Sequence, residues 1–156
     1  MTLVTRGGSA RSFHVGATTH AQLLPIIRAN IQAETSVMTD SATWYKALGD
    51  TFASHGSVNH RDGEYVRSEV YPGTVQPLKV HTNTVEGYYS IFKRGMKGIY
   101  QHCSEKHLHR YLAEYDFRYS HRVRLGYSDE ARTALALKGI VGKRLMYRRP
   151  DKAEVN

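Results

Sequence analysis

The order of the predicted secondary-structure elements constrains the fold more than any other feature of this 156-residue sequence. Short β-prone runs alternate with helical patterns in the first part of the chain, and only helical patterns follow residue 82. Strands are predicted at 3–6, 12–15, 36–40, 57–60 and 64–66. Helices are predicted at 20–33, 42–54, 83–95, 104–119 and 128–138, with a loop at 68–80. This order indicates an α/β or α+β fold with helices packed on a sheet.

Glycine and serine residues mark several of the predicted element ends. Gly7, Gly8 and Ser9 separate the first two strands, which predicts a hairpin. Ser41 is predicted to cap the helix that follows it, because a serine hydroxyl can accept a backbone N–H of the first turn. The helix at 128–138 is predicted to start at Ser128, with Asp129 and Glu130 in its first turn. Gly56 is predicted to close the helix at 42–54.

The positive charge of the chain is concentrated in its C-terminal part. Residues 1–90 carry seven Lys and Arg against seven Asp and Glu, whereas residues 91–156 carry fifteen against seven. The second part therefore accounts for the whole net charge of +8. This asymmetry is typical of a protein with a polyanionic partner such as DNA, and a solvated basic face without a partner is the alternative.

Other features of the composition exclude several classes of protein. The longest apolar runs, such as residues 23–27, are far shorter than the roughly 20 residues that cross a bilayer, so no membrane partner is expected. No apolar segment of a secretory signal occurs in residues 1–12. Cys103 is the single cysteine, which excludes an internal disulfide and is typical of a reducing cytosol. The histidines around it match no common zinc-site spacing.

Two carboxylates are placed where they could carry chemistry. Asp40 is predicted at the end of a strand, and Glu86 in the first turn of a helix. Such groups can face one crevice and supply the oxygen ligands that Mg²⁺ or Mn²⁺ prefers. Taken alone the signal is weak, because an aspartate at a strand end more often caps the next helix, and a glutamate in a first turn often interacts with the helix terminus.

The sequence around Glu86 is more specific. Residues 81–94 read His-Thr-Asn-Thr-Val-Glu-Gly-Tyr-Tyr-Ser-Ile-Phe-Lys-Arg, and the lysine, Lys93, follows Glu86 by two helical turns, so the two share a face. This motif resembles the signature around the catalytic glutamate of bacterial insertion-sequence DDE transposases, in the branch that carries a zinc ribbon upstream. The resemblance extends over roughly residues 2–124.

The resemblance implies an RNase H-like mixed sheet flanked by helices, with a helical C-terminal part. Residues 1–124 are predicted to form a partial catalytic domain, and residues 125–156 a basic extension. Asp40 corresponds to the second aspartate of the triad, Glu86 to its glutamate and Lys93 to an accessory lysine. The family's chemistry is two-metal cleavage and strand transfer of DNA, with Mg²⁺ or Mn²⁺ held here by Asp40 and Glu86.

The same resemblance implies DNA as the partner, both as transposon ends and as target. It also implies assembly as a homo-oligomer and a bacterial cytoplasmic location near the nucleoid. Eight residues are predicted to contact DNA: His81, Asn83, Lys93, Arg94, Lys97, Arg110, Arg118 and Arg122. Tyrosines interleave with the last of these, at 111, 115, 119 and 127, and tyrosines four residues apart on a helix more often pack than stack on bases.

One departure from the family limits the expected activity. Residues 1–39 contain no aspartate, although the family's first catalytic aspartate lies on a strand before the one that residues 3–6 resemble. The upstream zinc-ribbon-like segment also has no counterpart. We therefore expect an N-terminally truncated copy with little strand-transfer activity by itself. A non-catalytic DNA-binding or regulatory fragment and a pseudogene remnant remain as alternatives.

Overall fold

The computed structural model describes residues 1–143 and contains two units, Met1–Ser120 and a second that begins at His121. The predicted strands and helices of the first unit are mostly present, although several of their ends differ. No helix within residues 1–143 is long and apolar enough to cross a membrane.

The predicted hairpin is confirmed. Strands β1 (Thr2–Val4) and β2 (Ala10–Ser12) pair antiparallel, with Val4 opposite Ala10. The turn is tight, because the Thr5 N–H donates to the Ser9 carbonyl at 2.9 Å and Gly7 takes a positive φ of 67°. The ladder therefore begins at the Val4–Ala10 pair next to the turn, and β2 begins two residues before the predicted strand.

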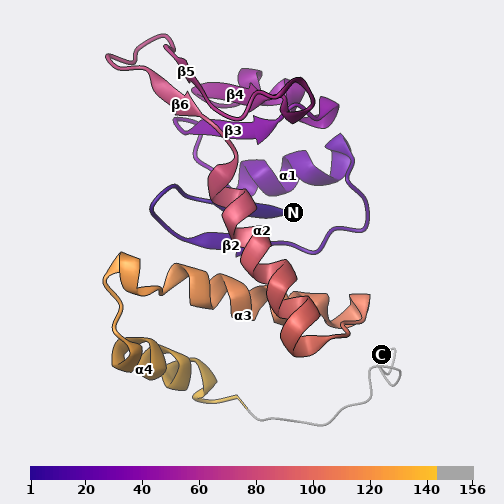
Figure 1. Cartoon of the computed structure of the whole chain (residues 1–156), viewed down its shortest axis with the longest axis vertical. Helices are drawn as coiled ribbons and strands as arrows, with labels where there is room; N and C mark the ends of the chain where they lie inside the picture. Colours follow the sequence, from indigo (N-terminus) through magenta and orange to yellow (C-terminus); the bar gives the residue numbers. More distant parts are fainter. Residues whose placement is uncertain (144–156) are drawn as a thin grey trace. The chain divides into compact units, whose positions relative to one another are not determined.

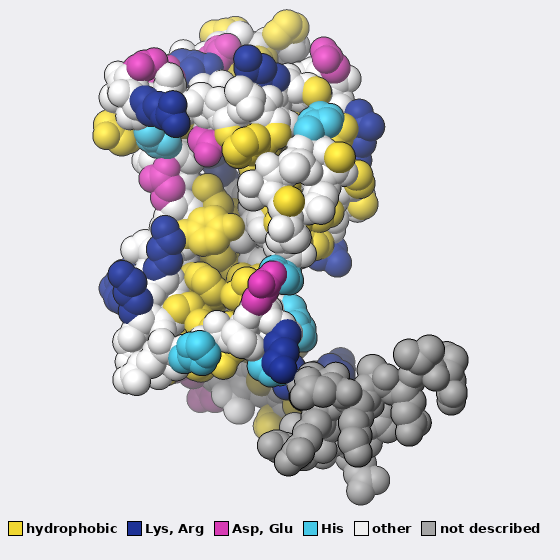
Figure 2. Space-filling view, turned by 90° about the vertical axis from the view of Figure 1, so that its right-hand side faces the viewer, with side chains coloured by type: hydrophobic (Ala, Val, Ile, Leu, Met, Phe, Trp, Pro, Cys, Tyr) yellow, Lys and Arg dark blue, Asp and Glu magenta, His cyan; other side chains and the backbone are white. Residues whose placement is uncertain are grey.

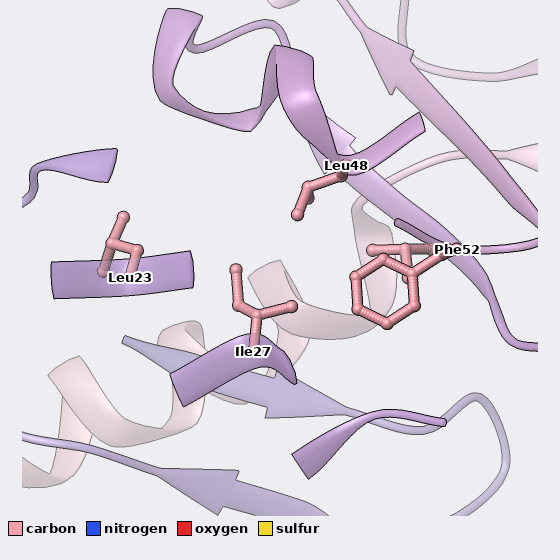
Figure 3. Packing of buried hydrophobic residues seen from close by; sticks show 5 residues of the cluster. Leu23, Ile27, Leu48 and Phe52 are labelled. Atoms are coloured by element: carbon pink, nitrogen blue, oxygen red, sulfur yellow. The ribbon is translucent and has the colours of Figure 1, made fainter. Parts of the chain in front are cut away.

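The first core lies between helix α1 (His20–Asn30), strand β3 (Ser36–Asp40) and a short helix, η1 (Thr43–Asp50). Leu23 and Ile27 of α1 point toward Leu48 and Phe52, as Figure 3 shows. Both α1 and β3 confirm the prediction. The helix predicted at 42–54 is shorter and of the 3-10 type, because Thr43, Trp44 and Tyr45 are weak helix formers and Gly49 lies near its end.

The prediction that Gly56 closes a helix is wrong, since Gly56 lies in the middle of strand β4 (Ser54–Val58). β4 runs parallel to β3, with Gly56 beside Met38 and Val58 beside Asp40. A Cβ at Gly56 would lie 2.6 Å from the Tyr71 hydroxyl and 2.7 Å from Val80 Cγ1. The glycine is therefore required for close packing over the strand.

The segment predicted as a loop at 68–80 contains two strands, β5 (Arg67–Glu69) and β6 (Leu78–Val80), paired antiparallel. Each of these strands has only three residues and shows little alternation of apolar and polar side chains. The sequence therefore offers no strand signal here. No strand forms over the predicted range 64–66.

Helix α2 (Asn83–Gly95) confirms the predicted helix and continues into a π-helical turn, Met96–Tyr100. Helix α3 (Leu108–Ser120) follows a one-turn 3-10 helix, Glu105–His107. Figure 1 shows α2 crossing the β1–β2 hairpin on its way from β6 to α3. The second core forms there, around Tyr88, Tyr115 and Ala10.

A partly buried polar cluster joins this second core. The Tyr88 hydroxyl donates to Asp116 Oδ1 at 2.7 Å, and the Ser12 N–H donates to Asp116 Oδ2 at 2.6 Å. Burial, together with the nearby Asp116, raises the pKa of the Tyr88 phenol. The carboxylate of Asp116 thereby ties α3 to both α2 and β2.

The second unit contains helix α4 (Asp129–Ile140), close to the predicted 128–138. Ser128 caps this helix, because its hydroxyl accepts the Ala131 N–H at 3.2 Å. None of the α4 residues is buried. The last part of the predicted basic extension, residues 144–156, lies outside the described residues.

The structure confirms a mixed α and β class. The strands of residues 1–143 form three two-stranded sheets, β1–β2, β3–β4 and β5–β6, whereas one mixed sheet was expected. Four of these strands are only three residues long, and each of the strands pairs with a single partner strand. The RNase H-like arrangement remains a prediction.

Candidate active site

Asp40 lies at the C-terminal end of β3 with an exposed side chain. Its Oδ1 accepts the Ala42 N–H at 3.2 Å, which stabilises the turn into η1. The predicted cap residue, Ser41, instead donates its hydroxyl to Asn59 Oδ1 at 3.3 Å, so that cap prediction is wrong. Asp40 therefore has a local structural role, and its other oxygen makes no hydrogen bond within the described residues.

Glu86 lies in the first turn of α2, where its side chain is 53% exposed. The Thr82 hydroxyl, directly before the helix, donates to Glu86 Oε1 at 2.5 Å. His60 Nε2 lies 3.1 Å from the same oxygen. These contacts differ from a capping box, in which the glutamate would accept the backbone N–H of the cap residue.

Asp40 and the residue that contacts Glu86, His60, both lie at the C-terminal ends of the paired strands β3 and β4. Asp40 is beside Val58 in the parallel register, and His60, which contacts Glu86, follows Val58 by two residues. Tyr45 lies nearby: burial first, and then the negative charge of Asp40, raise the pKa of its phenol, with a smaller effect from Tyr89 of α2. The strand-end and helix-start carboxylates are thus both connected to the ends of β3 and β4, and a common site for them remains a prediction.

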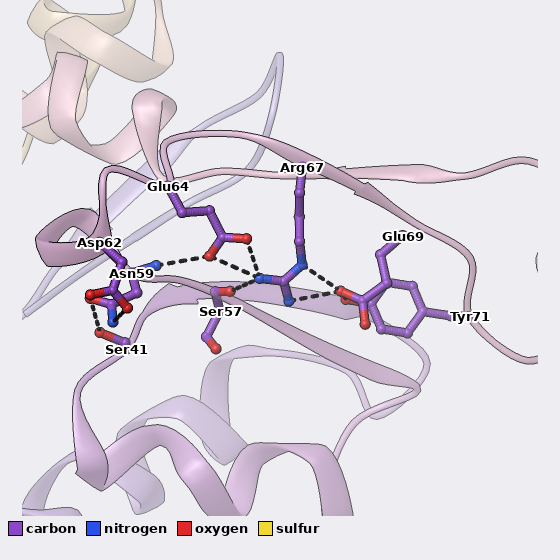
Figure 4. Close-up of polar contacts among 8 residues, drawn as sticks. All are labelled: Ser41, Ser57, Asn59, Asp62, Glu64, Arg67, Glu69 and Tyr71. Carbon is purple, nitrogen blue, oxygen red and sulfur yellow. Dashed lines mark hydrogen bonds and ion pairs between the residues drawn. The ribbon is translucent and has the colours of Figure 1, made fainter.

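A network of polar contacts holds the segment that carries His60, as Figure 4 shows. Glu64 Oε2 accepts the Asn59 N–H at 3.1 Å, and Arg67 donates both to Glu64 and to the Ser57 carbonyl. The hydrogen bond from Arg67 holds the pKa of Glu64 below its ordinary value. These bonds connect the end of β4 to β5 and fix the backbone just before His60.

The other side of the Arg67 guanidinium also has hydrogen-bond partners. Its Nη2 donates to Glu69 Oε2 at 2.8 Å, and the Tyr71 hydroxyl donates to the same oxygen at 2.9 Å. Burial and the bond to Glu69 raise the pKa of Tyr71 to about 12. A half-buried arginine between two carboxylates is a rigid connection rather than a free cation, so Arg67 is not available for a ligand.

An open groove of about 420 Å³ lies along α2 and is lined by Glu86, Tyr89, Ser90 and Lys93. Lys93 is exposed, and its position beside Glu86 agrees with the two-turn spacing in the sequence. On the face drawn in Figure 2, Lys and Arg side chains border a recess where hydrophobic side chains gather. The groove can therefore present a carboxylate and a cation to one ligand.

The other predicted DNA contacts are distributed over several elements. Asn83, Arg94 and Lys97 are exposed on α2 and the π-helical turn that follows it. His81 is partly buried, and its Nδ1 has no hydrogen-bond partner within the described residues. Burial, and then the charges of Arg6 and Lys79, lower the pKa of His81, which disfavours its charged form. These roles remain predictions.

The arginines on α3 and beyond are not all free cations. Arg118 pairs with Glu114 at 2.9 Å, which offsets its charge. Arg110 is exposed on α3, and Arg122 belongs to the second unit. The tyrosines between them pack as expected: Tyr115 is buried, and Tyr119 contacts Tyr88 edge to face at 5.4 Å.

Sequence reasoning missed His60 and Thr82 as residues of this site. Thr82 lies within the motif at 81–94 and His60 within the wider range of the resemblance, but neither is assigned a role by the sequence. No periodicity could reveal them, because their importance comes from a contact between the end of β4 and the start of α2, 22 residues further along the chain.

Comparison with known proteins identifies the family. The model of the ISXO2-like transposase domain matches residues 1–120, which end where the first structural unit ends. The chain therefore belongs to this family of insertion-sequence transposases, as the motif at 81–94 predicts. No curated protein and no solved structure matches the chain.

Proposed function

We propose that this chain acts on DNA in transposition, and that Asp40 and Glu86 are its ligands for a divalent cation. The observation that carries the proposal is the groove lined by both Glu86 and Lys93, and it is supported by Asp40 at the end of β3 and by the contact of Glu86 with His60, two residues beyond β4. Membership of a transposase family supports DNA as the partner, and DDE transposases generally use divalent metals. Oligomerisation and association with the nucleoid belong to the same proposal.

The donor atoms of the two carboxylates fit a hard cation. Each has one oxygen engaged by the protein, Asp40 Oδ1 by a backbone N–H and Glu86 Oε1 by Thr82 and His60. The second oxygen of each makes no hydrogen bond within residues 1–143. Fixed carboxylates with one free oxygen are suitable ligands for Mg²⁺ or Mn²⁺.

The residues around the site have separate tasks in this mechanism. Bound divalent ions would supply Lewis-acid activation of a water or 3′-hydroxyl and charge stabilisation at the leaving oxygen. Lys93 binds a phosphate beside the scissile bond and orients it toward Glu86. Arg94 and Lys97 add sequence-independent attraction for the DNA backbone. We place these residues on an RNase H-like catalytic domain.

Within residues 1–143, no third ligand is arranged with this pair to hold a metal ion. Residues 1–39 contain no aspartate, and within residues 1–143 no group of three or more His, Cys, Asp or Glu is arranged to hold a metal ion. We therefore propose that the isolated chain binds metal weakly and catalyses little strand transfer. The same observation favours a second candidate function, in which the chain binds DNA and regulates transposition without catalysis.

The contribution of Lys93 can be measured through the salt dependence of DNA binding. Replacing Lys93 with alanine is expected to reduce the slope of log K against log salt by about one, because one phosphate contact is lost. The measurement is fluorescence anisotropy of a labelled duplex in Mg²⁺ over a salt series. Lys138→Ala, an exposed lysine outside residues 1–120, is the control and should change the slope less. Equal slopes for wild type and Lys93→Ala would contradict the role of Lys93.

A further inference from the structure

His60 makes two close contacts through one ring nitrogen. Its Nε2 lies 2.9 Å from the Thr82 hydroxyl oxygen and 3.1 Å from Glu86 Oε1. The side chain is about two-thirds buried, and the Tyr65 ring lies 5.3 Å from the imidazole. The three groups form a closed triangle, because the Thr82 hydroxyl also donates to Glu86 Oε1 at 2.5 Å.

The chemistry of these groups determines where the proton on His60 lies. The Thr82 hydroxyl has a single hydrogen, which it gives to Glu86, so toward His60 it can act only as an acceptor. The carboxylate oxygen of Glu86 is also an acceptor. The hydrogen bond between His60 and Thr82 therefore has Nε2 as its donor, and Glu86 Oε1 lies 3.1 Å from the same nitrogen.

The backbone on either side of His60 is held firmly enough to make this donor a fixed one. Asn59 Oδ1 accepts the Arg61 N–H at 3.2 Å, and the Asn59 amide donates to Asp62 at 2.6 Å. The Glu64–Arg67 contacts continue this support into β5. Ser41, directly after Asp40, bonds to the same Asn59, so the site's two strand ends are joined.

We propose that His60 is a positioning residue for Glu86. It donates from Nε2 to the Thr82 hydroxyl, which in turn donates to Glu86 Oε1, and the two residues together fix the rotamer of an otherwise flexible, half-exposed side chain so that Oε2 faces the cation site. This inference rests on the proposed function, in which Glu86 is a metal ligand. It assigns His60 to the ligand's support and not to the metal itself, which binds through oxygen atoms.

Titration of Mn²⁺ into the full chain, followed by electron paramagnetic resonance, tests the proposal. His60→Leu removes the donor and is expected to weaken Mn²⁺ binding by about 10- to 100-fold. His60→Gln places an amide N–H near the position of Nε2 and should restore most of the affinity, whereas His60→Asn is one methylene too short and should not. Thermal melts of each variant confirm that the fold is retained.

Several results would overturn the proposal. Wild-type affinity in His60→Leu would show that the donor is unimportant, and a His60→Gln variant as weak as His60→Leu would show that only ring packing matters. Nitrogen coupling from His60 in the Mn²⁺ spectrum would show that His60 is a ligand instead.

A measurement without metal separates this inference from the proposed function. At about pH 8.5, where an ordinary histidine is neutral, long-range ¹H–¹⁵N NMR is expected to show His60 as the Nε2–H tautomer. An Nδ1–H tautomer would overturn the inference even if Mn²⁺ binds. Failure of the wild-type chain to bind Mn²⁺, with the Nε2–H tautomer present, would instead overturn the proposed metal site and leave the His60–Glu86 contact established.

Discussion

Replacing Gly95 with alanine is expected to destabilise the Met1–Ser120 unit by about 3 kcal/mol. A Cβ at this position would overlap the hydroxyl oxygen of Tyr115 and lie 2.7 Å from its Cζ. Tyr115 is only 7% exposed, and its ring packs edge to face against Phe92 at 5.1 Å, so it has little space to move. The gain in helix propensity from glycine to alanine, about 1 kcal/mol, is too small to compensate.

Urea denaturation followed by circular dichroism measures this effect, and α2 offers a matched control. Gly87 lies in the same helix, and a Cβ there meets nothing within 4 Å. Gly87→Ala should therefore be neutral or slightly stabilising. Equal stabilities for the Gly95→Ala and Gly87→Ala variants would show that α2 and α3 do not approach each other as closely as described.

Removal of either proposed metal ligand should have the largest effect on function. Asp40→Asn and Glu86→Gln keep the size of each side chain but remove its charge, and each is expected to lower Mn²⁺ affinity by about 100-fold or more. Groups that only contact a ligand already contribute about 10- to 100-fold, so a ligand should contribute at least as much. The double variant should show no measurable binding.

Isothermal titration calorimetry of Mn²⁺ into the full chain provides the measurement. Asp50→Asn, an exposed aspartate on η1, is the control and should bind like the wild type. Because Asp40 and Glu86 are both exposed, their replacement should change the melting temperature little. Unchanged affinity in either single variant would remove that residue from the proposed site.

The parts of the fold that could be predicted from sequence are those with a clear period or turn signal. In α2 the apolar residues Val85, Tyr88, Tyr89 and Phe92 recur at helical spacing, and the helix is found where it was expected. The Gly7-Gly8-Ser9 turn similarly predicted the β1–β2 hairpin. In both cases local sequence and tertiary packing favour the same structure.

The elements that could not be predicted depend on contacts between distant residues. β5 and β6 are short and polar, and their pairing is supported by Arg67 and its carboxylate partners rather than by an apolar face. Gly56 resembles a helix end in sequence, yet its role is to allow Tyr71 and Val80 to approach β4.

For the candidate site, the sequence motif identified Glu86 and Lys93, and the groove contains both. Asp40 was predicted from its strand-end position and its spacing within the resemblance. His60 could not be recognised in the same way, because a histidine after a strand has no characteristic pattern until its partner is known. The contact with Glu86 joins β4 to α2 and is a property of the tertiary structure alone.

The most direct test of a cation site at Asp40 and Glu86 is cleavage of the polypeptide by Fe²⁺ bound there. In the presence of ascorbate, bound Fe²⁺ generates hydroxyl radicals that cut the backbone near its ligands, and mass spectrometry locates the cuts. We predict cuts clustered near residues 40 and 86, suppressed by excess Mg²⁺ and absent from the Asp40→Asn, Glu86→Gln double variant. Cuts confined to another region, such as the histidines at 102–109, or cuts unaffected by the double variant, would contradict the proposed site.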